Sequence, residues 1–150
     1  MEDYQHTIQL KTDANQVFNA LTKEIPLWWT EMFEGASNKK GQFFTVRFGE
    51  NVFKMMEVKE LVANTKVEWN VKDSLIAIPE LKNQSEWIGT SIIWEIKPSS
   101  TLTVLKLTHK GLNQGIECYD ICSEGWQQFI NSLRTYIETG KGNPFKSLGK

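Results

Sequence analysis

Apolar and polar residues alternate along several segments of the chain, a pattern typical of β-strands with one buried face. Residues 4–11 form the first such segment, and residues 42–71 contain three more that are separated by turns. Alternation returns in residues 90–97 and in residues 103–109. The pattern therefore predicts six strands, which short turns would connect into an antiparallel sheet.

The first two strands within residues 42–71 do not reveal which of their faces is buried. Phe43 and Phe44 are adjacent, and Lys54 falls on the same side as Met56 and Val58. A β-bulge, which inserts one extra residue into a strand, would resolve this conflict. The pattern leaves the inward face of these two strands open.

Two short helices are predicted after the first strand. Asp13 followed by Gln16 resembles a capping box, and apolar residues then recur at helical spacing, so a helix is expected over residues 14–21. A second short helix is expected after Thr22, because Pro26 is tolerated in a first helical turn.

A long helix is predicted near the end of the chain. Apolar residues recur about every 3.6 positions over residues 119–139, and Gly140 follows at the place of a helix C-cap. The apolar stripe consists of Tyr119, Cys122, Trp126, Phe129, Ile130, Leu133 and Ile137. We expect this stripe to pack against the sheet.

This order of elements predicts an α+β fold, in which a curved six-stranded antiparallel sheet surrounds the long C-terminal helix. One helix covers only the middle of such a sheet, so the two short helices would have to close the remaining gap, where a ligand has room. Residues 72–87 lack periodicity, and we interpret them as a lid. The length of 150 residues predicts one domain over residues 1–150.

The charge balance and the apolar runs exclude several classes of partner. Seventeen Lys and Arg residues nearly cancel 18 Asp and Glu residues, and a net charge of −1 gives no field that would attract nucleic acid. No apolar run of about 18 residues exists, and the first residues are polar, so neither a membrane span nor a secretory signal is predicted. We expect a cytoplasmic protein.

Cys118 and Cys122 are four positions apart, which places both thiols on one helix face. In a reducing compartment we interpret them as small buried apolar residues. A metal site would need further ligands, and the sequence has neither a Cys-x-x-Cys nor a His-x-x-x-His motif. We therefore predict no metal and no cofactor.

His6 and His109 are the only histidines, and alternation places both on the side of apolar neighbours. His109 is a core histidine held by hydrogen bonds, the polar contact of a ligand, or a general acid or base. The sequence has no catalytic-triad order and no phosphate-binding loop, so no catalytic residue is assigned. Arg47 would bind a carboxylate or phosphate if its side of the strand faced inward.

Aromatic residues are more abundant than a minimal core requires, with six Trp and eight Phe in 150 residues. Large rings either fill the core completely or leave irregular space that forms a pocket. We predict a pocket between the sheet and the C-terminal helix. Its expected lining is Trp29, Phe44, Met56, Trp69, Trp94, His109, Trp126, Phe129, Ile130 and Leu133.

Six short motifs follow one another along nearly the whole chain. They are Val17 to Leu21 leading to Trp28-Trp29; Glu34-Gly35 with Gly41 and Phe44; Glu86 to Thr90; Thr108 to Leu112; Glu117 to Asp120; and Ser132-Leu133 with Thr139 to Phe145. In this order they resemble the SRPBCC superfamily, and in particular its branch of activator of heat-shock protein 90 ATPase homologues. The resemblance implies the helix-grip fold, which START lipid-transfer domains, pollen-allergen-like proteins and polyketide cyclases share.

The resemblance implies a cavity but supplies no catalytic motif. The function we predict is binding of a small hydrophobic, lipid-like molecule between the sheet and the C-terminal helix. Two alternatives stay open: a stand-alone co-chaperone-like interaction module of the heat-shock protein 90 activator type, and a cyclase- or hydrolase-type enzyme that uses the same cavity. A retained small molecule would favour the predicted binding function, and an exposed apolar patch would favour the interaction module.

Overall fold

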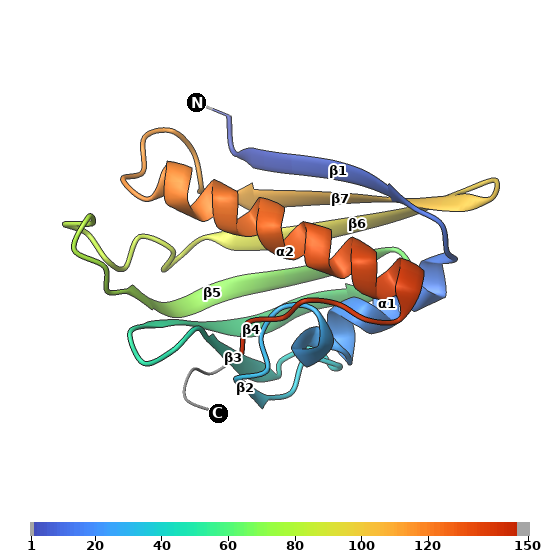
Figure 1. The fold of residues 1–150 in the computed structure, drawn as a ribbon, viewed down its shortest axis with the longest axis horizontal. Helices are drawn as coiled ribbons and strands as arrows, with labels where there is room; N and C mark the ends of the chain where they lie inside the picture. Colours follow the sequence, from blue (N-terminus) through green and yellow to red (C-terminus); the bar gives the residue numbers. More distant parts are fainter. Residues whose placement is uncertain (1, 147–150) are drawn as a thin grey trace.

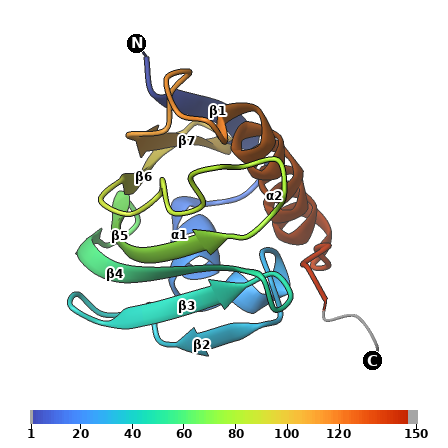
Figure 2. The same ribbon diagram turned by 90° about the vertical axis from the view of Figure 1, so that its left-hand side faces the viewer.

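Every strand that the structure describes belongs to one curved antiparallel sheet, and the C-terminal helix crosses its concave side (Figures 1 and 2). The computed structural model describes residues 2–146. The strands are β1 (Tyr4–Leu10), β2 (Phe33–Gly35), β3 (Phe43–Arg47), β4 (Val52–Val62), β5 (Lys66–Ile76), β6 (Ser91–Ser99) and β7 (Leu102–Lys110); the helices are α1 (Ala14–Thr22), the 3₁₀ turn η1 (Ile25–Leu27) and α2 (Tyr119–Thr139). The strand order is β1-β7-β6-β5-β4-β3-β2.

Helix α2 follows the predicted range of residues 119–139. Its buried face contains Trp126, Ile130 and Leu133, in keeping with the apolar stripe. Gly140 ends the helix in the left-handed conformation with φ of 85°, which glycine adopts without steric cost. No helix within residues 2–146 is long and apolar enough to cross a membrane.

Helix α1 is also confirmed, whereas the second short helix is reduced to one 3₁₀ turn. The carboxylate of Asp13 caps α1 by accepting the backbone N–H of Gln16 at 2.9 Å. After η1 the chain turns at Trp28 and Trp29, which are both buried in the core. The indole Nε1–H of Trp28 donates to the carbonyl of Ala20 at 2.8 Å and so ties this segment to α1.

The sheet has seven strands, so the prediction of six was wrong by one. The additional strand, β2, has three residues and pairs antiparallel with β3. It runs from Phe33 to Gly35, where the sequence pattern predicted no strand. A strand of three residues is too short to show alternation, and this explains why the pattern missed it.

The inward face of β3 and β4 is now defined. Phe44 is buried and Phe43 is 49% exposed, while Lys54 lies on the buried side with Met56 and Val58. Two register shifts occur in the pairing of β4 with β5, as a bulge would produce. Lys54 therefore points into the interior although it is charged.

Arg47 lies on the outward side of β3. Its Nε is 2.8 Å from the carboxylate of Glu34, and both side chains are substantially exposed. The condition for the predicted anion site at Arg47 is not met, because alternation from the exposed Phe43 carries Arg47 outward.

The predicted lid over residues 72–87 starts later than expected, because β5 continues to Ile76. The loop that follows is fastened to the start of α2. The carboxylate of Glu117 accepts the backbone N–H groups of Lys82 and Asn83, each at 2.9 Å. In return, the carboxylate of Glu86 accepts the N–H groups of Glu117 and Cys118. These bonds fix the loop against α2.

Candidate functional site

All six tryptophans belong to one network of neighbouring rings between α2 and the sheet. Trp29 stacks on Trp28 and Trp69 with centroid distances of 5.5 and 5.8 Å. Trp126 of α2 lies 5.3 Å from Trp29 and 5.9 Å from Trp87. Trp94 completes the network. The rings fill most of the space in which a ligand was expected.

Hydrogen bonds to both ring nitrogens hold His109 within this network of rings. The Nε1–H of Trp126 donates to Nδ1 of His109 at 3.0 Å, so the ring proton must be on Nε2. Nε2 then donates to Oγ1 of Thr90 at 2.9 Å, and this hydroxyl donates to the carbonyl of Trp87 at 2.6 Å. Burial, and then the charge of Lys54, lower the pKa of His109 to about 3. His109 is thus a neutral core histidine with both nitrogens engaged.

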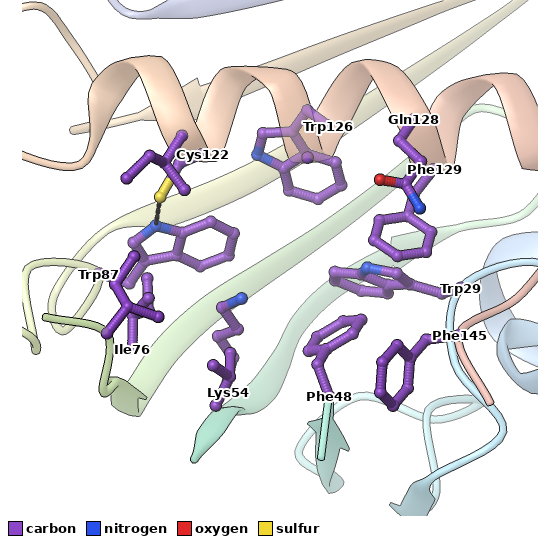
Figure 3. A pocket seen from close by; sticks show the side chains of 14 residues that line it. Trp29, Phe48, Lys54, Ile76, Trp87, Cys122, Trp126, Gln128, Phe129 and Phe145 are labelled. Carbon is purple, nitrogen blue, oxygen red and sulfur yellow. Dashed lines mark hydrogen bonds between the residues drawn. The ribbon is translucent and has the colours of Figure 1, made fainter. Parts of the chain in front are cut away.

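A cavity of about 300 Å³ lies beside this core, between the first half of α2 and the ends of β4 and β5 (Figure 3). The loop after β5 and the segment around Phe145 complete its wall. It is lined by Trp29, Phe48, Val52, Lys54, Ile76, Ile78, Trp87, Ile121, Cys122, Gly125, Trp126, Gln128, Phe129 and Phe145. Apolar and aromatic groups dominate this lining, as is usual for small-molecule sites.

Three of the ten residues that we predicted as ligand-binding line the cavity: Trp29, Trp126 and Phe129. The other seven do not line this cavity, because they lie in the core between sheet and helix. These seven are Phe44, Met56, Trp69, Trp94, His109, Ile130 and Leu133.

The cavity wall at Trp29 and Phe145 is held by backbone hydrogen bonds. The N–H of Phe145 donates to the carbonyl of Trp29, and the N–H of Glu31 donates to the carbonyl of Phe145, both at 2.9 Å. Oγ of Ser132 on α2 donates to the carbonyl of Trp28 and accepts the N–H of Asn143, both at 2.7 Å. These bonds fix the C-terminal segment beside the rings of the cavity.

Lys54 is the charged residue of the cavity lining that sequence reasoning missed. Its Nζ lies 4.5 Å from the ring centroid of Trp87 and 4.7 Å from that of Phe48, on the interior side of β4 (Figure 3). Burial lowers its pKa to about 8. The sequence shows that Lys54 falls on the same side of its strand as Met56 and Val58, and this could have indicated a buried position. The pattern alone did not decide which face of the strand was buried.

Cys122 lines the same cavity, and Cys118 lies against it. Cys118 and Cys122 are buried and form no disulfide, and their sulfurs share a hydrogen bond at 2.6 Å. The Nε1–H of Trp87 donates to Sγ of Cys122 at 3.2 Å. The hydrogen bond to Cys118, followed by that from Trp87, lowers the pKa of Cys122, while the bond to Cys122 and burial raise the pKa of Cys118. Within residues 2–146, no three His, Cys, Asp or Glu side chains gather as metal ligands would.

The sequence profile of the family "Activator of Hsp90 ATPase homolog 1-like protein" matches residues 11–138. This match begins directly after β1 and covers every other strand and nearly all of α2. No curated protein matches the chain.

Solved structures match almost the whole chain. The Aha1 dimer from Colwellia psychrerythraea has a TM-score of 0.75 and 25% identity over 95% of this chain and 100% of its own. DynU16, a protein of the dynemicin biosynthetic locus, has a TM-score of 0.73 and 18% identity over 95% of this chain and 49% of its own. SSP2350 from Staphylococcus saprophyticus has a TM-score of 0.70 and 17% identity over 94% of this chain and 95% of its own. The last two share the fold.

Proposed function

Since the chain belongs to the family of Activator of Hsp90 ATPase homolog 1-like proteins, we propose that it binds a small apolar molecule in the cavity between α2 and the sheet. The observation that carries this proposal is the aromatic lining of a cavity of about 300 Å³ beside an otherwise filled core. This volume is at the lower end of the usual range for small-molecule sites, so the proposal is a compact ligand.

Gly125 offers a direct test, because it lines the cavity from α2 and an added Cβ there meets nothing within 4 Å. Gly125→Leu should place a side chain in the cavity and should also favour the helix by about 0.5–1 kcal/mol. Gln127→Leu is the matched control, since Gln127 is exposed on the same helix and does not line the cavity.

The measurement is the binding of Nile red, an uncharged dye whose fluorescence rises in apolar surroundings. The wild-type protein and Gln127→Leu should bind the dye with equal affinity, and Gly125→Leu should bind it at least tenfold more weakly. Urea unfolding should show that Gly125→Leu is folded. Equal dye binding by all three proteins would mean that the dye does not enter this cavity, and the proposal would then be wrong.

The alternative of a co-chaperone-like interaction module is suggested by the family name and by the similarity to Aha1. Such a module does not need the cavity. If Nile red fails to bind the folded wild-type protein, this alternative becomes the better explanation. The enzyme alternative loses its general acid or base at His109, because both ring nitrogens of that residue are engaged in hydrogen bonds.

A further inference from the structure

We propose that the cavity selects an apolar molecule that carries a carboxylate, and that Lys54 and Ser74 bind the carboxylate. The inference rests on the proposed function, because it specifies the chemistry of a ligand in the same cavity. It is drawn from two polar side chains that lie together on the interior side of β4 and β5 and that lack partners within residues 2–146.

Lys54 is the first of these side chains. It is the only charged residue among the fourteen that line the cavity, and it is 9% exposed. No salt bridge or hydrogen bond from its ammonium group is found within residues 2–146; the rings of Phe48 and Trp87 are its polarisable neighbours. Buried charges in proteins are normally paired, so an unpaired ammonium that faces a cavity points to an anion from outside the fold.

Ser74 is the second side chain. It pairs directly with Lys54 across the β4–β5 ladder, so both side chains project from the same face of the sheet. Ser74 lies behind the lining residues of the cavity; it is 2% exposed, and its Oγ has no hydrogen-bond partner within residues 2–146. A buried hydroxyl without a partner is costly, and this one belongs to the strand neighbour of Lys54.

The two groups together match the chemistry of one carboxylate. A carboxylate has a single negative charge and two acceptor oxygens, and Lys54 supplies one positive charge while Ser74 supplies one neutral donor. A phosphate monoester carries about two negative charges and would leave one unbalanced, since no second cation lines the cavity among residues 2–146. A cationic ligand would be repelled by Lys54. The apolar rings around the pair would take up the remainder of the molecule.

The test compares octanoate with octanol, two probes of equal chain length that differ in the carboxylate. Both are titrated against bound Nile red at pH 7 in wild type, Lys54→Met, Ser74→Ala and Lys97→Met. Lys97→Met is the matched control, because Lys97 is exposed on β6. Wild type and the control should bind octanoate at least tenfold more tightly than octanol.

The two variants of the site should change this preference in a graded way. Lys54→Met should lose the preference for octanoate while it still binds octanol and Nile red, and Ser74→Ala should weaken octanoate several-fold. Equal affinities for both probes in wild type, or a preference that survives in Lys54→Met, would overturn the inference and leave the proposed function intact. Failure of octanol and Nile red to bind wild type would instead overturn the proposed function, and the inference with it.

Discussion

His109 and Lys54 are two basic side chains buried between α2 and the same sheet, and their surroundings differ in one respect. His109 has a hydrogen-bond partner for each ring nitrogen. Lys54 has aromatic rings around its ammonium group but no partner for its charge within residues 2–146. Burial lowers the pKa of both residues, to about 3 and about 8 respectively.

The comparison separates two regions of the interior. The closed region around His109 is filled by rings and gives both ring nitrogens of His109 a partner, although the indole N–H groups of Trp69 and Trp94 have none within residues 2–146. The open region around Lys54 contains a cavity and leaves the charge of Lys54 and the hydroxyl of Ser74 without partners. An unpaired buried charge lowers stability, so the charge of Lys54, which borders the cavity, is better explained by a ligand than by folding.

Trp126→Ala should have the largest effect, because Trp126 belongs to both regions. It donates to His109 and lines the cavity, and its side chain is 2% exposed. Removing it leaves a large void and a histidine nitrogen without a donor, so we expect a loss of about 3–5 kcal/mol in urea unfolding. A loss below about 1 kcal/mol would show that the rings around α2 are not the core of the fold.

The second largest effect should be the contribution of His109 to the pH dependence of stability. Its pKa falls from 6.5 in the unfolded chain to about 3 in the fold, so the unfolded state binds more protons between these values. Stability should therefore fall as the pH is lowered from about 6.5 to 3, by up to about 4 kcal/mol from this residue. His109→Gln should lack this component when urea unfolding is followed over the same range. Identical slopes for both proteins would contradict the buried neutral state.

Lys54→Met should raise stability, in contrast to the first two changes. The pKa of Lys54 is lowered from 10.5 to about 8, so stability should rise as the pH increases from about 8 to 10.5 while the fold releases its proton first. At pH 7, replacing the charge should stabilise the fold by about 1–3 kcal/mol. Other titratable groups near Lys54 are His109 on β7 and the thiols of Cys118 and Cys122 at the start of α2. To separate the titration of the thiols from that of Lys54, the pH dependence of urea unfolding should also be measured for Cys122→Ser. Destabilisation by Lys54→Met would contradict this account.

The smallest expected changes in stability are those of substitutions at two buried serines, Ser132 and Ser74. Ser132 uses its hydroxyl as both donor and acceptor, whereas the Oγ of Ser74 has no partner within residues 2–146. In urea unfolding, Ser132→Ala should cost about 1–2 kcal/mol, and Ser74→Ala should be neutral or stabilise by up to about 1 kcal/mol. Equal losses in the two variants would mean that Ser74 is satisfied in the folded protein.

Much of the fold could be predicted from the sequence because it depends on periodic patterns. The stripe of α2 and the alternation around Trp94 in β6 and Leu107 in β7 have regular spacing over many residues, and all three elements were predicted. The three-residue strand at Phe33 is too short for a pattern, and the extension of β5 to Ile76 follows a register shift that alternation does not show.

The candidate site was harder to predict, because its position depends on how rings pack. Sequence identified the ring-rich interior and three residues of the cavity wall, but no pattern tells which rings fill space and which border it. His109 was chosen as the polar contact because it lies among apolar residues, and Lys54 satisfies the same criterion. Distinguishing them required their hydrogen-bond partners, which only the three-dimensional structure supplies.

The separation of the two regions can be tested most directly through the six indole N–H groups, observed by ¹⁵N NMR during a titration with octanol. The account predicts that the largest shifts occur at the tryptophans that line the cavity, Trp29, Trp87 and Trp126. The signals of the tryptophans in the closed core should move least; these are Trp28, Trp69 and Trp94. The largest shifts at the closed-core tryptophans, or equal shifts at all six, would contradict a ligand site in the open region.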